Sequence, residues 1–215
     1  MTIPPLPPPL PPPPPAGNKA QAVTTTPKPP VVTTTGPQGA FKVELLIFNG
    51  HPYKDHWAYW FESRSDPDVG VVIHVVGDVR KGFEFQIKRS HDFKLTNSQP
   101  TKRISLQWID GKYLDERAMF NNGECKVDKH PVCAFEASAH KVQPPAGSLN
   151  SISEASLLSF LAMSIPVNPS DQANRVGRRV VQRDCQTWIV ESADQLVRDG
   201  ILTEGVRQYL RAIQQ

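Results

Sequence analysis

The chain has 215 residues, with 24 Lys and Arg against 21 Asp and Glu, and a formal net charge of +3. Fourteen of its 22 prolines fall in residues 1–40, where Lys19 and Lys28 are the only charged residues. The remainder is therefore close to neutral, which argues against a nucleic-acid-binding protein, because such proteins present a basic surface. That remainder is long enough for one domain with a substantial core.

Cysteine usage and the amino-terminal sequence indicate the compartment. Three scattered cysteines (Cys125, Cys133 and Cys185) do not form the dense, even set of a disulfide-stapled secreted domain. The first residues lack a basic segment and are interrupted by prolines, so they do not resemble a signal peptide. No run of 18 apolar residues suggests a transmembrane segment. We expect a soluble cytoplasmic protein, and nothing in the sequence indicates a cofactor.

Residues 1–40 form a proline-rich tail that has too few large apolar groups to offset the entropy of ordering. We expect it to be disordered, with polyproline II character. The sequence "PPLP" occurs twice in it, which predicts partner binding by an aromatic-grooved module through Pro4, Pro5, Leu6, Pro7, Pro8, Pro9, Leu10 and Pro11. Without a flanking Arg, a WW-type or profilin-like partner is favoured over an SH3 domain. The alternative is an inert solubilising spacer.

The domain, residues 41–215, begins with strand-like sequences. "AFKVELLIFN" predicts a strand, and "DHWAYWFE" and "GVVIHVVGD" predict a hairpin whose two apolar faces place it centrally in a sheet. If Glu62 lies opposite Gly70, His56 and His74 are diagonal neighbours on one face of the sheet.

The following segments predict further strands and then helices. "GFEFQIK" predicts a strand, a second hairpin is expected around Asp110-Gly111, and "CAFEASAHKV" alternates like a strand. Ser151 and Glu154 form a capping box before a helix that Pro166 ends. The expected fold class is α+β with an antiparallel sheet.

The stretch from Arg183 to Gly200 predicts an amphipathic helix that carries Cys185 in its first turn. Asp184 can cap its start, and Gly200 suits a left-handed carboxy-terminal cap. Helix N–H groups favour a thiolate and can stabilise an oxyanion, so Cys185 is a candidate nucleophile. The alternative is a small buried core residue. A nearby imidazolium would lower the pKa of this thiol, while Asp184 and burial would raise it.

The motifs "DHWAYWF", "GVVIHVVGD" and "DCQTWIVE" together resemble the circularly permuted papain-like hydrolases and acyltransferases of the lecithin:retinol acyltransferase-like group, which are related to NlpC-type peptidases. The resemblance implies a His-bearing hairpin first and a Cys-bearing helix near the carboxy terminus. It implies Cys185 as nucleophile, His56 as base and His74 as the orienting residue. The family usually has Asn before the cysteine, where this chain has Asp184.

These features predict a cysteine-dependent hydrolase or acyltransferase that acts through an acyl-enzyme on an amide, ester or thioester. Trp57, Gln186 and Arg183 are candidate substrate-binding residues, and the substrate is expected to be a peptide, a protein conjugate or a soluble acyl compound. The alternative function is a catalytically silent papain-like binding or scaffold module recruited through its proline-rich tail. Zinc binding by Cys125, His130, Cys133 and His140 is disfavoured because tight two-cysteine knuckles are missing, so no metal is expected.

Overall fold

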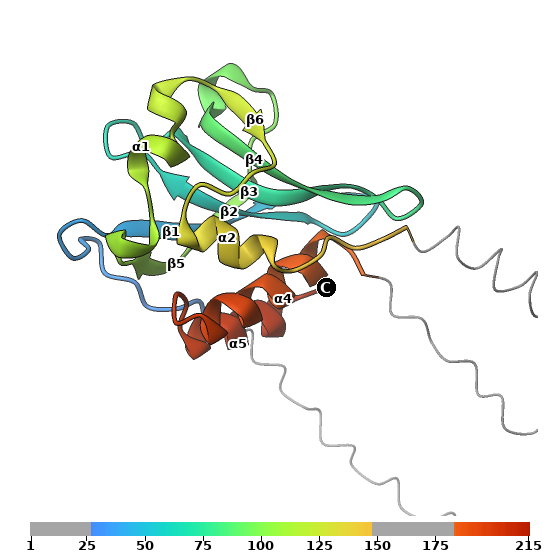
Figure 1. Ribbon diagram of the computed structural model, residues 1–215. Coiled ribbons are helices and arrows are strands. Elements are labelled where there is room, and N and C mark those ends of the chain that lie inside the picture. The colour runs from blue at the N-terminus through green and yellow to red at the C-terminus, as the bar shows by residue number, and fades with distance from the viewer. Residues whose placement is uncertain (1–26, 148–182) are drawn as a thin grey trace, which may run out of the picture.

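A computed structural model describes residues 27–147 and 183–215. Its centre is a six-stranded antiparallel sheet with the order β5-β1-β2-β3-β4-β6 (Figure 1). The strands are β1 (Phe41–Phe48), β2 (His56–Glu62), β3 (Val69–Asp78), β4 (Gly82–Asp92), β5 (Lys102–Ile109) and β6 (Lys126–Asp128). The predicted α+β class is confirmed, as is the central position of the β2–β3 hairpin with Glu62 opposite Gly70.

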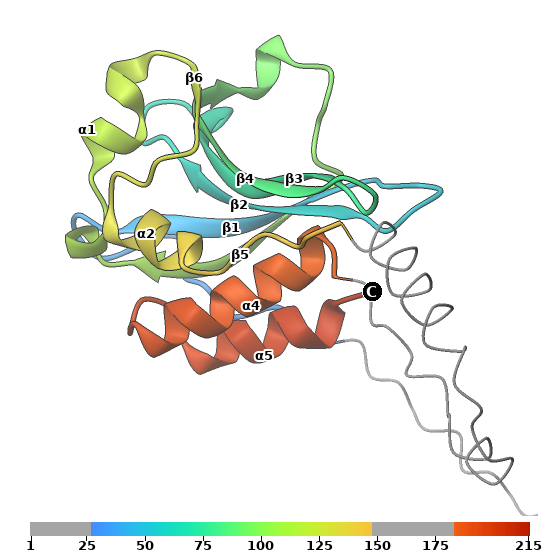
Figure 2. The same ribbon diagram turned by 45° about the vertical axis from the view of Figure 1, so that its right-hand side comes forward.

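Helices cover one face of the sheet. They are α2 (Ala134–His140), α4 (Cys185–Arg198) and α5 (Glu204–Ile213), while the single-turn α1 (Glu116–Met119) lies near β6 (Figures 1 and 2). Helix α4 begins and ends close to the predicted positions. Asp184 caps α4 by accepting a hydrogen bond from the Thr187 N–H at 2.9 Å. Gly200 follows α4 with a φ of +71°, the left-handed conformation expected of a terminating glycine.

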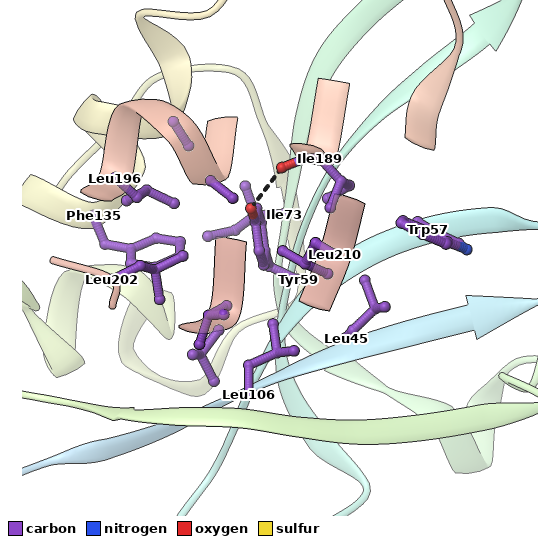
Figure 3. Packing of buried hydrophobic residues seen from close by; sticks show 14 of the residues in the cluster. Leu45, Trp57, Tyr59, Ile73, Leu106, Phe135, Ile189, Leu196, Leu202 and Leu210 are labelled. Carbon is purple, nitrogen blue, oxygen red and sulfur yellow. Dashed lines mark hydrogen bonds between the residues drawn. The ribbon is translucent and has the colours of Figure 1, made fainter. Parts of the chain in front are cut away.

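The main core lies between the sheet and these helices. Alternate residues of β2 (Trp57, Tyr59 and Phe61) point into it, because successive side chains of a strand point to opposite faces. The Tyr59 hydroxyl donates to the Ile189 carbonyl at 3.0 Å and so joins β2 to α4 (Figure 3). The intervening residues of β2 point to the other face, where a smaller cluster contains Leu46, Ala58, Trp60, Val72 and Phe93.

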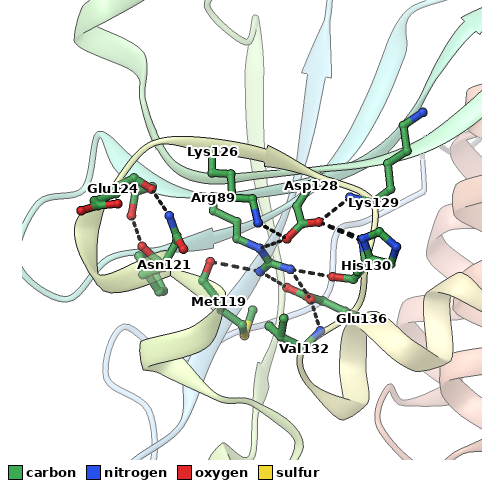
Figure 4. A network of polar contacts seen from close by, with 12 residues as sticks. Arg89, Met119, Asn121, Glu124, Lys126, Asp128, Lys129, His130, Val132 and Glu136 are labelled. Carbon is green, nitrogen blue, oxygen red and sulfur yellow. Dashed lines mark hydrogen bonds and ion pairs between the residues drawn. The ribbon is translucent and has the colours of Figure 1, made fainter.

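A buried ion-pair network joins β4 to the segment from α1 to α2. Both charged ends of Arg89 and Glu136 are almost completely buried, and two hydrogen bonds of 3.0 and 3.1 Å connect them (Figure 4). Arg89 also donates to Asp128 on β6 and to the carbonyls of Met119 and His130. The guanidinium therefore ties α1, β6, the segment after β6 and α2 to strand β4 through charge-assisted hydrogen bonds.

Two predicted elements are wrong. The segment "CAFEASAHKV" forms helix α2, with Phe135, Ser138 and Ala139 buried at helical spacing, because its alternation coincides with a helical stripe. Asp110-Gly111 does not turn a hairpin. The Asp110 carboxylate instead accepts a hydrogen bond from the Lys112 N–H at 2.9 Å and starts a short 3₁₀ turn that leads towards α1.

Three predicted segments lie wholly or partly outside residues 27–147 and 183–215. The two "PPLP" motifs and the expected helix from Ser151 to Pro166 lie outside the described residues. Of the expected disordered tail, residues 27–40 are described, and the Trp108 indole N–H donates to the Thr33 carbonyl at 2.9 Å. Fixed contacts with the sheet thus begin before residue 41.

Within the described ranges, no helix has both the length and the hydrophobicity needed to span a membrane.

Candidate active site

Two histidines of neighbouring strands form a hydrogen-bonded pair. Nε2 of His56, at the start of β2, lies 2.9 Å from Nδ1 of His74 on β3. Nε2 of His74 lies 3.2 Å from Oε1 of Gln86, its cross-strand neighbour on β4. The diagonal proximity expected from the register of the hairpin is therefore present. We call His56 and His74 the dyad.

The contacts of the dyad define its tautomers. An amide oxygen can only accept, so Nε2 of His74 carries a hydrogen and donates it to Gln86. Nδ1 of His74 is then an acceptor, and Nε2 of His56 donates to it. The remaining nitrogen of His56, Nδ1, consequently bears a lone pair. A lone pair at this position is what a general base requires.

Both imidazoles are neutral at physiological pH. Burial lowers the pKa of His56 to about 4, assisted by the positive charge of Lys88. Burial lowers the pKa of His74 to about 3, with further contributions from His56 and Lys88. The dyad is therefore uncharged, and any proton that it receives must be stabilised by its surroundings.

Cys185 begins helix α4 and lies against the strand that carries His56. Its side chain is 8% exposed, and its Sγ is 3.9 Å from the carbonyl oxygen of Asp55. The backbone N–H of Trp57 also acts on the sulfur and favours its thiolate. The thiol thus lies beside the peptide groups on both sides of His56.

Burial dominates the ionisation of this thiol. It raises the pKa of Cys185, and the negative charge of Asp184 raises it further, while backbone N–H groups of Trp57 and Gln186 act in the opposite direction. Burial and the charge of Asp184 therefore outweigh the backbone N–H groups, and their net effect on the pKa of Cys185 disfavours the thiolate. Asp184 itself forms an ion pair with Lys54 at 3.0 Å, in addition to capping the helix.

The structure brings the two histidines together but does not join Cys185 to them by a hydrogen bond. Alternation along β2 explains the separation. Trp57 points into the core beneath α4, whereas His56 points to the face of Ala58 and Trp60. The β2–β3 ladder ends at the pair formed by Tyr59 and Ile73, so the two strands diverge before His56. The start of α4 approaches the sheet beside this divergence.

The three candidate substrate-binding residues have different surroundings. Trp57 is buried in the main core. Gln186 is completely buried, and its amide donates to the Asp55 carbonyl at 2.8 Å and to Gln215 at 3.1 Å. Arg183 pairs with Glu191 on the next turns of α4. Gln186 therefore supports the segment before His56, and Arg183, which precedes α4, is turned towards that helix.

Sequence reasoning missed two residues around the dyad. Gln86 was within a predicted strand, and extending the hairpin register by one strand places it opposite His74. Gln215 gave no comparable signal, because its link to Asp55 spans 160 positions of the chain. Its side chain accepts from the Asp55 N–H at 3.1 Å.

The other cysteines and histidines do not assemble into a comparable site. Cys125 is exposed and Cys133 lies at the start of α2, where burial raises its pKa to about 12. In residues 27–147 and 183–215, no three His, Cys, Asp or Glu side chains are placed to hold a metal ion together.

Comparison with known proteins finds one family. The model of DUF6540, a family of unknown function, matches residues 43–203, which include the dyad and Cys185. No curated protein and no solved structure matches the chain.

Proposed function

The chain belongs to the DUF6540 family, and we propose that it is a cysteine-dependent hydrolase or acyltransferase with a permuted papain-like arrangement of His-bearing hairpin and Cys-bearing helix. One observation carries the proposal. The chain of contacts from Gln86 through His74 to His56 leaves a lone pair on Nδ1 of His56, and the thiol of Cys185 lies beside the peptide groups on either side of that residue.

In the proposed reaction, Sγ of Cys185 attacks the carbonyl carbon of an amide, ester or thioester. The thiol proton passes to Nδ1 of His56, and the backbone N–H of Cys185 donates to the oxyanion. Collapse of the tetrahedral intermediate breaks the bond to the leaving group, which takes the proton from His56. Water or an acceptor nucleophile then attacks the thioester, returning the proton to the thiol as the acyl group leaves.

The ionisation states favour proton transfer during attack over a preformed ion pair. The imidazole of His56 has a pKa of about 4, and the pKa of the Cys185 thiol is raised, so both groups are neutral before the substrate binds. Because His56 points to the face of the sheet away from α4, with its ring against Phe48, the proposed reaction requires the His56 side chain to turn towards the thiol when the substrate binds. His74 then acts as a positioning residue that fixes the tautomer of His56.

The proposed substrates are peptides, protein conjugates or soluble acyl compounds. The proline-rich tail would then serve to bring the domain to a WW-type or profilin-like partner, and the reaction itself requires no metal.

The proposal is tested by locating the acyl group. Full-length protein is mixed with p-nitrophenyl esters and aryl thioesters of increasing chain length, quenched in acid, and analysed by intact mass and peptide mapping. We expect a stoichiometric acyl adduct on Cys185 that is lost in Cys185→Ala. Cys133→Ala, which removes another shielded cysteine, is the matched control and should retain the adduct. Absence of any adduct with all esters, or an adduct that persists in Cys185→Ala, would refute the proposal.

A second candidate function is a catalytically silent module that binds or scaffolds through its proline-rich tail. Two observations favour it: the pKa of Cys185 is raised, and its sulfur has no hydrogen bond to either histidine of the dyad. A silent module predicts no adduct in the ester experiment. It also predicts that Cys185→Ala retains full binding of the partner.

A further inference from the structure

A pocket opens beside the dyad on the face of the sheet opposite α4. It has a volume of about 250 Å³. Its walls come from the end of β1, the start of β2, strands β3 and β4, and the segment after β4: Phe48, His56, Val72, His74, Lys88, His91, Thr96 and Ser98. We call it the dyad pocket. Cys185 does not line it, so its occupant meets the histidines from the side away from the thiol.

One end of the dyad pocket is cationic. Lys88 lies opposite Val72 in the β3–β4 register and projects from the same face. Its charge lowers the pKa of His56, His74 and His91, so it acts on every imidazole in the pocket. No carboxylate in the described part of the chain forms an ion pair with Lys88. Asp92, beside His91, is the acidic group that acts in the opposite direction.

The other parts of the pocket are apolar or carry neutral donors. The Phe48 ring packs against His56, with 5.9 Å between ring centroids, and Val72 is almost fully buried. The hydroxyl groups of Thr96 and Ser98 line the pocket on the segment that follows β4. At roughly 30 Å³ per water-sized group, the volume accommodates about eight such groups. The space therefore suits a short chain with a small head group.

We propose that the dyad pocket binds a small carboxylate, with its anionic group at Lys88 and its short apolar chain against Phe48 and Val72. A single ammonium is matched to a singly charged head group, whereas phosphate sites commonly use several cations or a bidentate Arg. The ligand is held by groups other than the thiol. Binding at this site therefore does not require the thiol, although the ligand acts on the base of the reaction proposed above.

Binding of a carboxylate has a consequence for the dyad. A negative charge at Lys88 offsets the positive field that disfavours imidazolium, and so raises the pKa of His56 and His74. A stronger base at His56 accepts a thiol proton more readily. The carboxylate therefore acts as an activator of the dyad.

The experiment follows the histidine ring resonances of the full-length protein by NMR. The ligands are butyrate, its neutral isostere butyramide, the cation butylammonium and inorganic phosphate. We expect butyrate to shift the His56 and His74 signals and to raise their titration midpoints. We expect it to bind at least about tenfold more tightly than butyramide, the difference expected from a charge-assisted hydrogen bond.

Variants separate this site from the proposed reaction. Lys88→Gln should weaken butyrate binding about tenfold or more, while Lys88→Arg, which keeps the charge, should retain it within a few fold. Lys102→Gln, on the exposed part of β5, is the control and should leave binding unchanged. Cys185→Ala should bind butyrate normally, so loss of acyl transfer and loss of this site are distinguishable.

Four outcomes would overturn the proposal: butyrate binding no more tightly than butyramide, phosphate binding more tightly than butyrate, unchanged butyrate affinity in Lys88→Gln, or loss of binding in Lys102→Gln as great as in Lys88→Gln.

Discussion

His56 and His74 share a hydrogen bond of 2.9 Å. The ladder between their strands stops at the pair formed by Tyr59 and Ile73, so it does not extend to either histidine. The divergence of β2 and β3 opens space between the strands, and the two rings meet edge to face across it, with 63° between their planes. This contact places two neutral imidazoles in a part of the sheet where protonation is unfavourable.

Lowering the pH should destabilise the folded protein, because it protonates this pair of histidines. Both histidines have folded-state pKa values of about 4 and 3, below the unfolded value of about 6.5. The unfolded chain therefore binds more protons, and stability present above pH 6.5 is lost as the pH falls towards these values. At about 1.4 kcal/mol per pKa unit, we expect a loss on the order of 3 kcal/mol for each histidine between pH 7 and pH 4.

Urea unfolding measured between pH 7 and pH 4 checks this expectation. His74→Gln removes one of the two groups and should flatten the pH dependence. His130→Ala replaces a histidine whose side chain is 93% exposed and should leave the slope unchanged. A wild-type slope identical to that of His74→Gln would mean that the dyad does not resist protonation.

The buried Arg89–Glu136 ion pair should be costly to break. Glu136→Gln leaves a buried guanidinium with an incomplete set of charged partners, and we expect a loss of about 3 kcal/mol or more in the free energy of unfolding. Lys129→Gln, which removes an ion pair between exposed side chains at Glu84, should change stability little, because solvent screens exposed pairs. Comparable losses in the two variants would show that Glu136 is not part of a desolvated network.

Asp184 should affect the thiol and the helix separately. Asp184→Asn keeps a capping side chain but removes the charge, so the pH midpoint for alkylation of Cys185 should fall while stability changes little. Asp184→Ala should lower that midpoint and also cost about 1 kcal/mol of stability. In the wild type we expect a midpoint above the value of about 8.5 for an unperturbed cysteine. An Asn variant that alkylates with the wild-type profile would exclude Asp184 as an influence on the thiol.

Local patterns were sufficient to predict the antiparallel sheet with its central hairpin and helix α4. Strand-like runs and the register set by Glu62 and Gly70 placed the histidines together, because side-chain alternation in a hairpin is a local rule. Asp184 and Gly200 predicted the ends of α4 because caps are also local.

What the sequence did not reveal depends on contacts between distant segments. Helix α2 was expected to be a strand. Glu136 in this helix pairs with Arg89, which lies 47 positions earlier, and no local sequence pattern predicts that contact. The raised pKa of Cys185 depends in the same way on how deeply α4 packs against β2. Gln215 reaches Asp55 only through the packed fold.

The central claim, that Cys185 attacks a carbonyl with His56 as its base, is tested most directly by the rate of acylation. The burst of p-nitrophenol from a reactive ester should be measured at pH 7 in the wild type, Cys185→Ala, His56→Ala and His74→Gln, after circular dichroism has shown that each variant is folded. We predict no burst in Cys185→Ala, a rate lowered by about 100-fold or more in His56→Ala, and an intermediate rate in His74→Gln, whose positioning role is indirect. A His56→Ala variant that acylates at the wild-type rate would contradict the account.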